Sequence, residues 1–195
     1  MRLNEEKKRN LYDKLGITRS GIIENGVISS GSVRDMLEVI SQFGEFDIEE
    51  NYRFTVQFFY HYITSNLDKI IALGNIKKTL QQLKDLGFTL ALVTNDSNLP
   101  TKAVLEVLKV ESLFDFIGTT DEFPSKPAIN ALEVISNEFH VLFHEMIYIG
   151  DSSVDEEFAS HTAGFVAIVN NEDNENRFKT ALFKVNSIEE LIKEK

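Results

Sequence analysis

The apolar positions of this chain change their spacing near residue 70. Before that point they recur every three or four residues, which is the period of an amphipathic helix, and no segment alternates as a strand would. Gly16 and Gly44 follow two of these stretches, where a helix commonly ends. The last stretch is rich in aromatic residues. The pattern predicts helices over residues 9–15, 32–43 and 48–67, with a loop or weak hairpin over residues 21–30.

From about Gly74 onward, short apolar runs alternate with helical stretches. The run 88–93 is apolar almost throughout, as expected for a strand that is buried on both faces. Repeated strand–helix units predict an α/β fold with a doubly wound parallel sheet and right-handed crossovers. Strands are expected at 88–93, 114–117, 146–149, 165–169 and 183–185, helices at 76–86, 99–110, 127–139, 153–162 and 188–193, and a polar surface loop at 170–176.

Composition narrows the class of protein. The 195 residues are 43% hydrophobic and 26% charged, which is typical of a globular protein. A net charge of −11 argues against nucleic acid as a partner. The absence of cysteine excludes disulfides and thiol chemistry, and it fits a cytoplasmic location. Residues 1–8 lack the apolar core of a secretory signal, and no apolar run is long enough to span a membrane. Nothing in the pattern indicates an oligomeric state.

Two groups of polar residues lie where such a sheet binds ligands, beyond the carboxyl ends of its strands. Thr94 and Asn95 directly follow the run 88–93. A threonine hydroxyl and the backbone amides after it can donate hydrogen bonds to a phosphoryl oxygen, although both residues also commonly end a strand. Lys126 opens a predicted helix, an unfavourable place for a cation. It is either a solvated side chain or the partner of a bound anion.

The most specific pattern is Gly150-Asp151 followed by Asp155, after the strand predicted over residues 146–149. The strand delivers Asp151 to its tip, and Asp155 lies one helical turn further on. Two carboxylates placed in this way can hold Mg²⁺ directly and through water, because hard cations prefer oxygen ligands. Alternatively, Asp151 caps the next helix and Asp155 lies in its first turn.

The order Thr94, Lys126, Gly150-Asp151-x-x-x-Asp155 resembles motifs two to four of the haloacid dehalogenase (HAD) superfamily. The flanking sequence is similar to the phosphoglycolate phosphatase and β-phosphoglucomutase-like subgroup. The resemblance implies a HAD-like Rossmannoid core over residues 71–195 and a helical cap domain over residues 1–70. It also implies a Mg²⁺-dependent phosphatase of small phosphorylated metabolites that works through an aspartyl-phosphate.

By this resemblance, Asp151 is a metal ligand and Asp155 is a second metal ligand or an orienting carboxylate. Thr94, with Asn95 beside it, binds a phosphoryl oxygen, and Lys126 holds the phosphate together with the charge of the nucleophile. The cap closes over the site and selects the substrate.

The first motif of the superfamily, Asp-x-Asp at the tip of the first strand, does not occur in the chain. Asp13 is the nearest candidate, but the polar residues before it cannot form a buried central strand. Either the nucleophile lies outside this sequence, or the scaffold binds phosphate or a partner without catalysis. A receiver-like signalling domain is a third reading, but it too needs an acidic pair after the first strand.

In the superfamily that the chain resembles, the first strand lies centrally, which implies a place between the strands 88–93 and 146–149; we expect these two in one sheet. The segment 21–28 is the candidate to fill that place.

Overall fold

The structure is a computed structural model that describes residues 3–169 and 177–192. Its N-terminal helical region, residues 3–70, consists of four helices, a short hairpin and a 3₁₀ turn. Gly16 ends the first helix in the left-handed conformation, with φ of 79°, and Ser32 and Asp47 cap the third and fourth helices. The elements are α1 (Glu5–Leu15), β1 (Ile17–Thr18), β2 (Gly21–Ile22), α2 (Val27–Ser30), α3 (Val33–Ser41), α4 (Ile48–Ser65) and η1 (Leu67–Lys69).

The remainder alternates strands with helices, which confirms the predicted α/β class. The β3–β4 half contains α5 (Ile76–Asp85), β3 (Ala91–Val93), α6 (Asn98–Leu108), η2 (Glu111–Leu113) and β4 (Phe116–Gly118). The β5–β7 half contains α7 (Asn130–Phe139), η3 (Phe143–Glu145), β5 (Ile147–Gly150), α8 (Ser153–Ala159), β6 (Gly164–Ile168), β7 (Ala181–Val185) and η5 (Ile188–Ile192). Every strand pair in these two halves is parallel.

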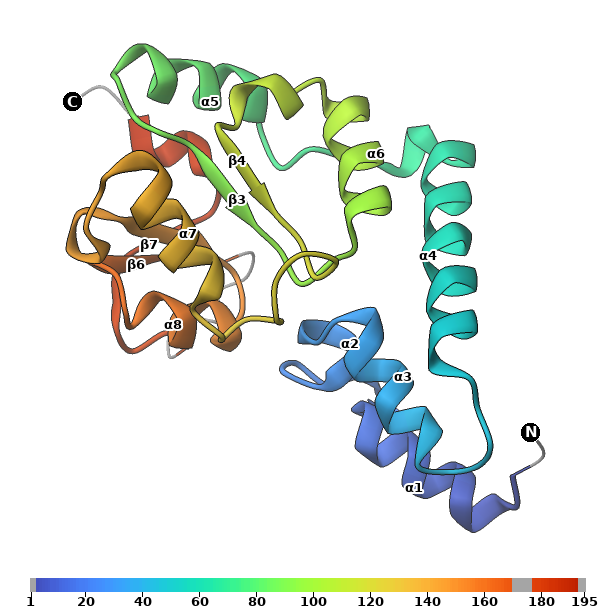
Figure 1. Cartoon of the computed structure of the whole chain (residues 1–195). Helices are drawn as coiled ribbons and strands as arrows, with labels where there is room; N and C mark the ends of the chain where they lie inside the picture. Colours follow the sequence, from blue (N-terminus) through green and yellow to red (C-terminus); the bar gives the residue numbers. More distant parts are fainter. Residues whose placement is uncertain (1–2, 170–176, 193–195) are drawn as a thin grey trace.

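Each half has its own buried cluster. Beside β3 and β4, the buried residues Leu80, Leu105 and Val110 pack together. In the other half, Phe165 and Ala167 of β6 pack with Ala159 and Phe178. Strand β6 is the central strand of its sheet, between β5 and β7, and its central residues are buried. Figure 1 shows the two groups of strands side by side. Helix α4 lies next to α6, at the edge of the molecule opposite β6 and β7.

The prediction that residues 88–93 and 146–149 lie in one hydrogen-bonded sheet is wrong. Among the described strands, β3 pairs with β4 alone, while β5 pairs with β6 alone. The segment 21–28 does not fill the place between them, because Gly21–Ile22 pairs with Ile17–Thr18 and Val27–Ser30 is helical. Each of the two strands therefore keeps one edge without a strand beside it. This also corrects the expected burial of residues 88–93: Phe88 is 57% exposed and Ala91 is exposed too.

Smaller corrections concern the ends of elements. The helix expected from Pro127 begins at Asn130, so Lys126 lies in the loop before it. The last helix is a 3₁₀ helix over residues 188–192. Asp13 lies exposed on α1, as its polar surroundings predicted. The predicted loop 170–176 lies outside the described residues. Within the described part of the chain, none of the helices has both the length and the hydropathy to cross a bilayer.

Candidate functional site

The predicted site residues meet where β3 and β5 end, around a buried ion pair. Lys126 Nζ lies 2.7 Å from Asp155 Oδ1, and the two side chains are 12% and 6% exposed. The same ammonium donates to the Tyr148 hydroxyl at 2.9 Å. A buried ion pair offsets the cost of removing its charges from water only when the remaining hydrogen-bonding groups of both side chains also have partners. The carboxylate of Asp155 meets that condition.

Its second oxygen, Oδ2, accepts hydrogen bonds from the backbone amides of Asp151 and Ser152, at 3.1 and 3.0 Å, and from the Ser152 hydroxyl at 2.8 Å. Ser152 caps α8 and accepts from the Asp155 amide in return, which is a capping box. Burial alone would raise the pKa of Asp155, but the charge of Lys126 and the hydrogen bonds from Lys126 and Ser152 outweigh it, so the pKa is lowered. Asp155 is therefore a buried carboxylate that is held ionised.

Gly150 permits this arrangement. A Cβ atom at residue 150 would lie 2.5 Å from Cγ and Oδ2 of Asp155. The Asp155 carboxylate folds back over the end of β5, and only glycine leaves room for it there. The glycine that the sequence pattern placed at the strand tip is needed for this close approach, rather than for an unusual backbone conformation.

Tyr148 connects the two halves of the α/β part. It projects from β5, and its hydroxyl lies 3.1 Å from the carbonyl oxygen of Val93 on β3 and 3.3 Å from Asp155 Oδ1. One hydroxyl proton serves one of these acceptors at a time. Burial, followed by the negative charge of Asp155, raises the pKa of Tyr148. Tyr148 was not among the residues predicted from the sequence, although a tyrosine between two isoleucines of a predicted strand was a signal that its hydroxyl needs a partner.

Asn95 joins the site to the N-terminal helical region. Its side-chain oxygen accepts from the Lys126 amide at 2.7 Å, and its side-chain nitrogen donates to the Ser30 carbonyl at 2.8 Å. A second contact of this kind runs from the Ser125 hydroxyl to Asp35 Oδ2, at 2.9 Å. Residues 30–35 therefore lie against the same rim as Lys126.

Thr94 and Asp151 lie at this rim without joining the ion pair. The Thr94 hydroxyl contacts Asp96, as donor to its carboxylate at 3.2 Å and as acceptor from its amide at 3.1 Å. Asp151 is exposed, and its carboxylate has no hydrogen-bond partner in the residues that the structure describes. Nor do three or more histidine, aspartate or glutamate residues form a metal-binding group within that part of the chain.

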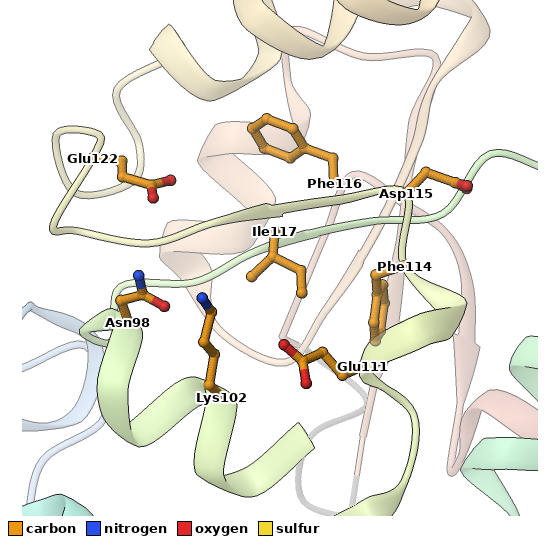
Figure 2. A pocket seen from close by; sticks show the side chains of 8 residues that line it. All are labelled: Asn98, Lys102, Glu111, Phe114, Asp115, Phe116, Ile117 and Glu122. Carbon is orange, nitrogen blue, oxygen red and sulfur yellow. The ribbon is translucent and has the colours of Figure 1, made fainter. Parts of the chain in front are cut away.

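A separate cavity of about 260 Å³ lies beside α6 and β4. Figure 2 shows the side chains that line it, among them Lys102 on α6 and Glu111 in the turn that follows. None of the five predicted site residues lines this cavity. Asp115, which also lines the cavity, forms an ion pair with Lys84, with Nζ 2.6 Å from Oδ1. This ion pair has a structural role. The ion pair and the cavity are thus distinct places, and the chemically organised one is the ion pair.

Comparison with known proteins identifies the class of protein to which this chain belongs. Residues 23–169 match the family model of haloacid dehalogenase-like hydrolases. This range is well over half of the chain, and the chain belongs to that family. Curated relatives of the chain are phosphoglycolate phosphatases, in agreement with the subgroup that the sequence resembles.

One such relative, from Mannheimia succiniciproducens, is 33% identical over 112 residues, which is 56% of this chain and 50% of the relative. Another, from Vibrio vulnificus, is 38% identical over 84 residues, 41% of this chain and 36% of the relative. The chain thus matches about half the length of these curated relatives, or less.

Solved structures show the fold over a longer range. CbbY from Rhodobacter sphaeroides in complex with phosphate has a TM-score of 0.70 at 16% identity, covering 95% of this chain and 87% of that one. A HAD phosphatase from Thermococcus onnurineus has a TM-score of 0.65 at 16% identity, covering 96% and 76%. The fold assignment therefore does not depend on β3 and β5 being hydrogen-bonded in one sheet.

Proposed function

We propose that this protein is a phosphatase that acts on small phosphorylated metabolites. In this proposal, the rim around Lys126 binds the phosphate group. The observation that carries this proposal is the buried pair of Lys126 and Asp155, with Thr94, Asn95 and Asp151 around it. Lys126 supplies the positive charge that an acidic protein needs in order to hold an anion. The relatives are phosphoglycolate phosphatases, so a small phosphorylated carboxylate is the substrate class that we propose first.

Magnesium fits this rim in one way. Mg²⁺ keeps several waters and commonly binds through one or two carboxylates together with substrate phosphate. Asp151 has an exposed carboxylate with free oxygens, whereas both oxygens of Asp155 are already taken by donors. We therefore propose Asp151 as the direct ligand and Asp155 as the residue that orients the loop. Mg²⁺, when bound, would neutralise charge on the phosphoryl group.

We further propose that the N-terminal helical region acts as a cap. The support is its contact with the rim: Ser30 accepts from Asn95, Asp35 accepts from Ser125, and Asn25 Oδ1 accepts from the Ser153 amide at 3.4 Å. A region placed in this way limits the size of the molecule that reaches Lys126.

A second candidate function is phosphate binding without hydrolysis. Within the described residues, the Lys126 ammonium donates hydrogen bonds to Asp155 and Tyr148, and to no carboxylate that is free to attack phosphorus. Aspartyl-phosphate catalysis requires such a nucleophile. On this alternative, the rim retains affinity for phosphate but has no turnover.

Hydrolysis of p-nitrophenyl phosphate and of phosphoglycolate, with and without Mg²⁺, separates the two functions. Mg²⁺-dependent turnover that is lost in Asp151→Asn supports the phosphatase. Absence of turnover, together with calorimetric binding of inorganic phosphate that is lost in Lys126→Met, supports the binding function. Lys102→Met is the matched control, because Lys102 lines the separate cavity. If neither turnover nor phosphate binding is found, both proposals fail.

A further inference from the structure

Helix α4 carries an aromatic stripe on the side that faces away from the molecule. Phe54, Phe58 and Tyr62 follow one another at intervals of four residues, and their side chains are 71%, 56% and 49% exposed. Residues four apart lie on the same side of a helix, one turn above another. The rings of Phe58 and Tyr62 are stacked, with centroids 6.5 Å apart. The stripe is therefore a continuous apolar surface.

The opposite side of α4 accounts for the packing of this helix within the chain. Val56 is buried, and it lies two residues from both Phe54 and Phe58, which is about half a turn around the helix. The Tyr52 hydroxyl donates to Asp121 and lies 3.2 Å from the Ser97 hydroxyl. Helices α3 and α6 are the principal neighbours of α4. Figure 1 shows α4 at the edge of the molecule, with α6 on its inner side. The outer rings thus have no role in holding α4 to the described chain.

A helix that is apolar on two opposite sides is normally covered on both. Contiguous exposed apolar surface of this kind commonly marks a contact with another molecule. In the segment after the helix, Leu67 and Ile71 are also exposed, at 51% and 80%.

The charges at the two ends of the stripe indicate the occupant. Glu50 lies one turn before Phe54, and Lys69 follows at the other end, with its ammonium 5.7 Å from the ring centroid of Tyr62. Neither takes part in any ion pair of the described residues. If a second copy of α4 lies antiparallel on the first, Glu50 of each copy meets Lys69 of the other, and Phe58 of each meets Tyr62. A twofold interface requires this kind of self-complementary surface.

We propose that the outer side of α4 is a homodimer interface, in which two antiparallel α4 helices bury their aromatic stripes and pair Glu50 with Lys69. An aromatic side chain presents roughly 200 Å² of surface, so the exposed fractions of the three rings provide on the order of 350 Å² per copy. Two copies thus reach over half of the roughly 1,200 Å² at which stable interfaces begin. The three rings alone fall short of that area, so we expect a weak dimer whose population depends on concentration.

Sedimentation velocity over a concentration series tests the proposal on the intact chain. We expect a monomer–dimer equilibrium that Phe58→Glu abolishes. Phe183→Glu is the matched control, since Phe183 is 67% exposed on β7, far from α4 in the chain. It should leave the equilibrium unchanged. Circular dichroism checks that both variants remain folded.

Charge reversal tests the antiparallel arrangement independently of the rings. Glu50→Lys and Lys69→Glu should each weaken the dimer at least several-fold, because like charges then meet. The double variant should restore most of the affinity, since the pairs re-form with opposite sign. An intact chain that stays monomeric to millimolar concentration would overturn the proposal, even if another protein binds the stripe. A dimer lost equally in Phe58→Glu and Phe183→Glu, or a double variant as weak as the singles, would overturn it as well.

Discussion

The β3–β4 half and the β5–β7 half of the α/β part differ in how their strands are covered. In the β5–β7 half, β6 has a partner strand on each edge, and Phe165, Val166 and Ala167 are all buried. In the β3–β4 half each strand has one partner, and no residue of β3 is buried. The buried hydrophobic cluster there consists of Leu80, Leu105 and Val110, which come from the helices and the turn beside the strands. Strands inside a parallel sheet are normally buried on both faces by the helices that cover them, whereas β3 has a partner strand on one edge alone and stays accessible.

Because of this difference, the contacts that cross from one half to the other determine whether the two behave as one unit. Lys126, Asp155 and Tyr148 provide one such connection, which reaches the Val93 carbonyl of β3. The 3₁₀ helix η5 provides another connection. Its Ile188 packs on the cluster beside β3, and its Glu189 accepts a hydrogen bond from the Asn75 amide. The rim around Lys126 is therefore also a structural joint between the two halves.

The strongest test of this joint is Asp155→Ala. The substitution leaves the Lys126 ammonium buried without its carboxylate, and removal of one partner of a buried pair costs about 3–5 kcal/mol. We expect the free energy of unfolding in urea to fall by that amount. Asp151→Ala is the control, because an exposed side chain without partners changes stability by less than about 0.5 kcal/mol. Equal effects of the two variants would contradict the assignment of Asp155 to the joint.

The same pair predicts a pH dependence. The pKa of Asp155 is lower in the folded state than the ordinary value near 3.9, so the unfolded chain takes up its proton first as the pH falls. The stabilisation is complete above about pH 4 and is lost as the pH drops through the folded-state value. We expect unfolding free energies measured from pH 6 to pH 3 to decline less steeply in Asp155→Ala than in the parent chain.

The next test asks whether the β3–β4 half supports its neighbour. Leu105→Ala removes buried side-chain volume from the cluster beside β3, which costs about 3 kcal/mol. If the joint couples the halves, hydrogen exchange should accelerate in β6 as well as in β3 and β4, because all of them then open together. Acceleration confined to β3 and β4 would mean that the two halves open separately.

The smallest effect is expected for Tyr148→Phe. The variant keeps the ring and removes one hydrogen-bonding group, which costs about 1 kcal/mol at neutral pH. The raised pKa of Tyr148 contributes stability that is present below the ordinary tyrosine value of about 10 and is lost as the pH rises above it. The free energy of unfolding should therefore decline less steeply with rising pH in Tyr148→Phe than in the unsubstituted protein. A parent and variant with parallel stability curves from pH 8 to pH 11 would show that the hydroxyl is not part of the joint.

Much of the fold and the site was predictable from short stretches of sequence. The period of apolar residues located α1, α3, α4, α5 and α6 within a few residues, and the alternation after Gly74 gave the α/β class. The order of Thr94, Lys126 and Gly150-Asp151-x-x-x-Asp155 pointed to the family that the comparison with known proteins then established. Tyr148 was missed because its role depends on Val93, 55 residues away.

What the sequence determined by itself is local: which segments turn as helices, which extend as strands, and which polar residues stand at the strand ends. Neighbours within a few positions decide these properties, since the helical and strand periods repeat over that range. Only the tertiary structure decided that β3 and β5 are not hydrogen-bonded to each other, that Asp155 forms an ion pair with Lys126, and that the aromatic stripe of α4 faces outward. These outcomes depend on which distant groups are present to meet an edge, a charge or an apolar surface, and that is a property of the whole folded chain.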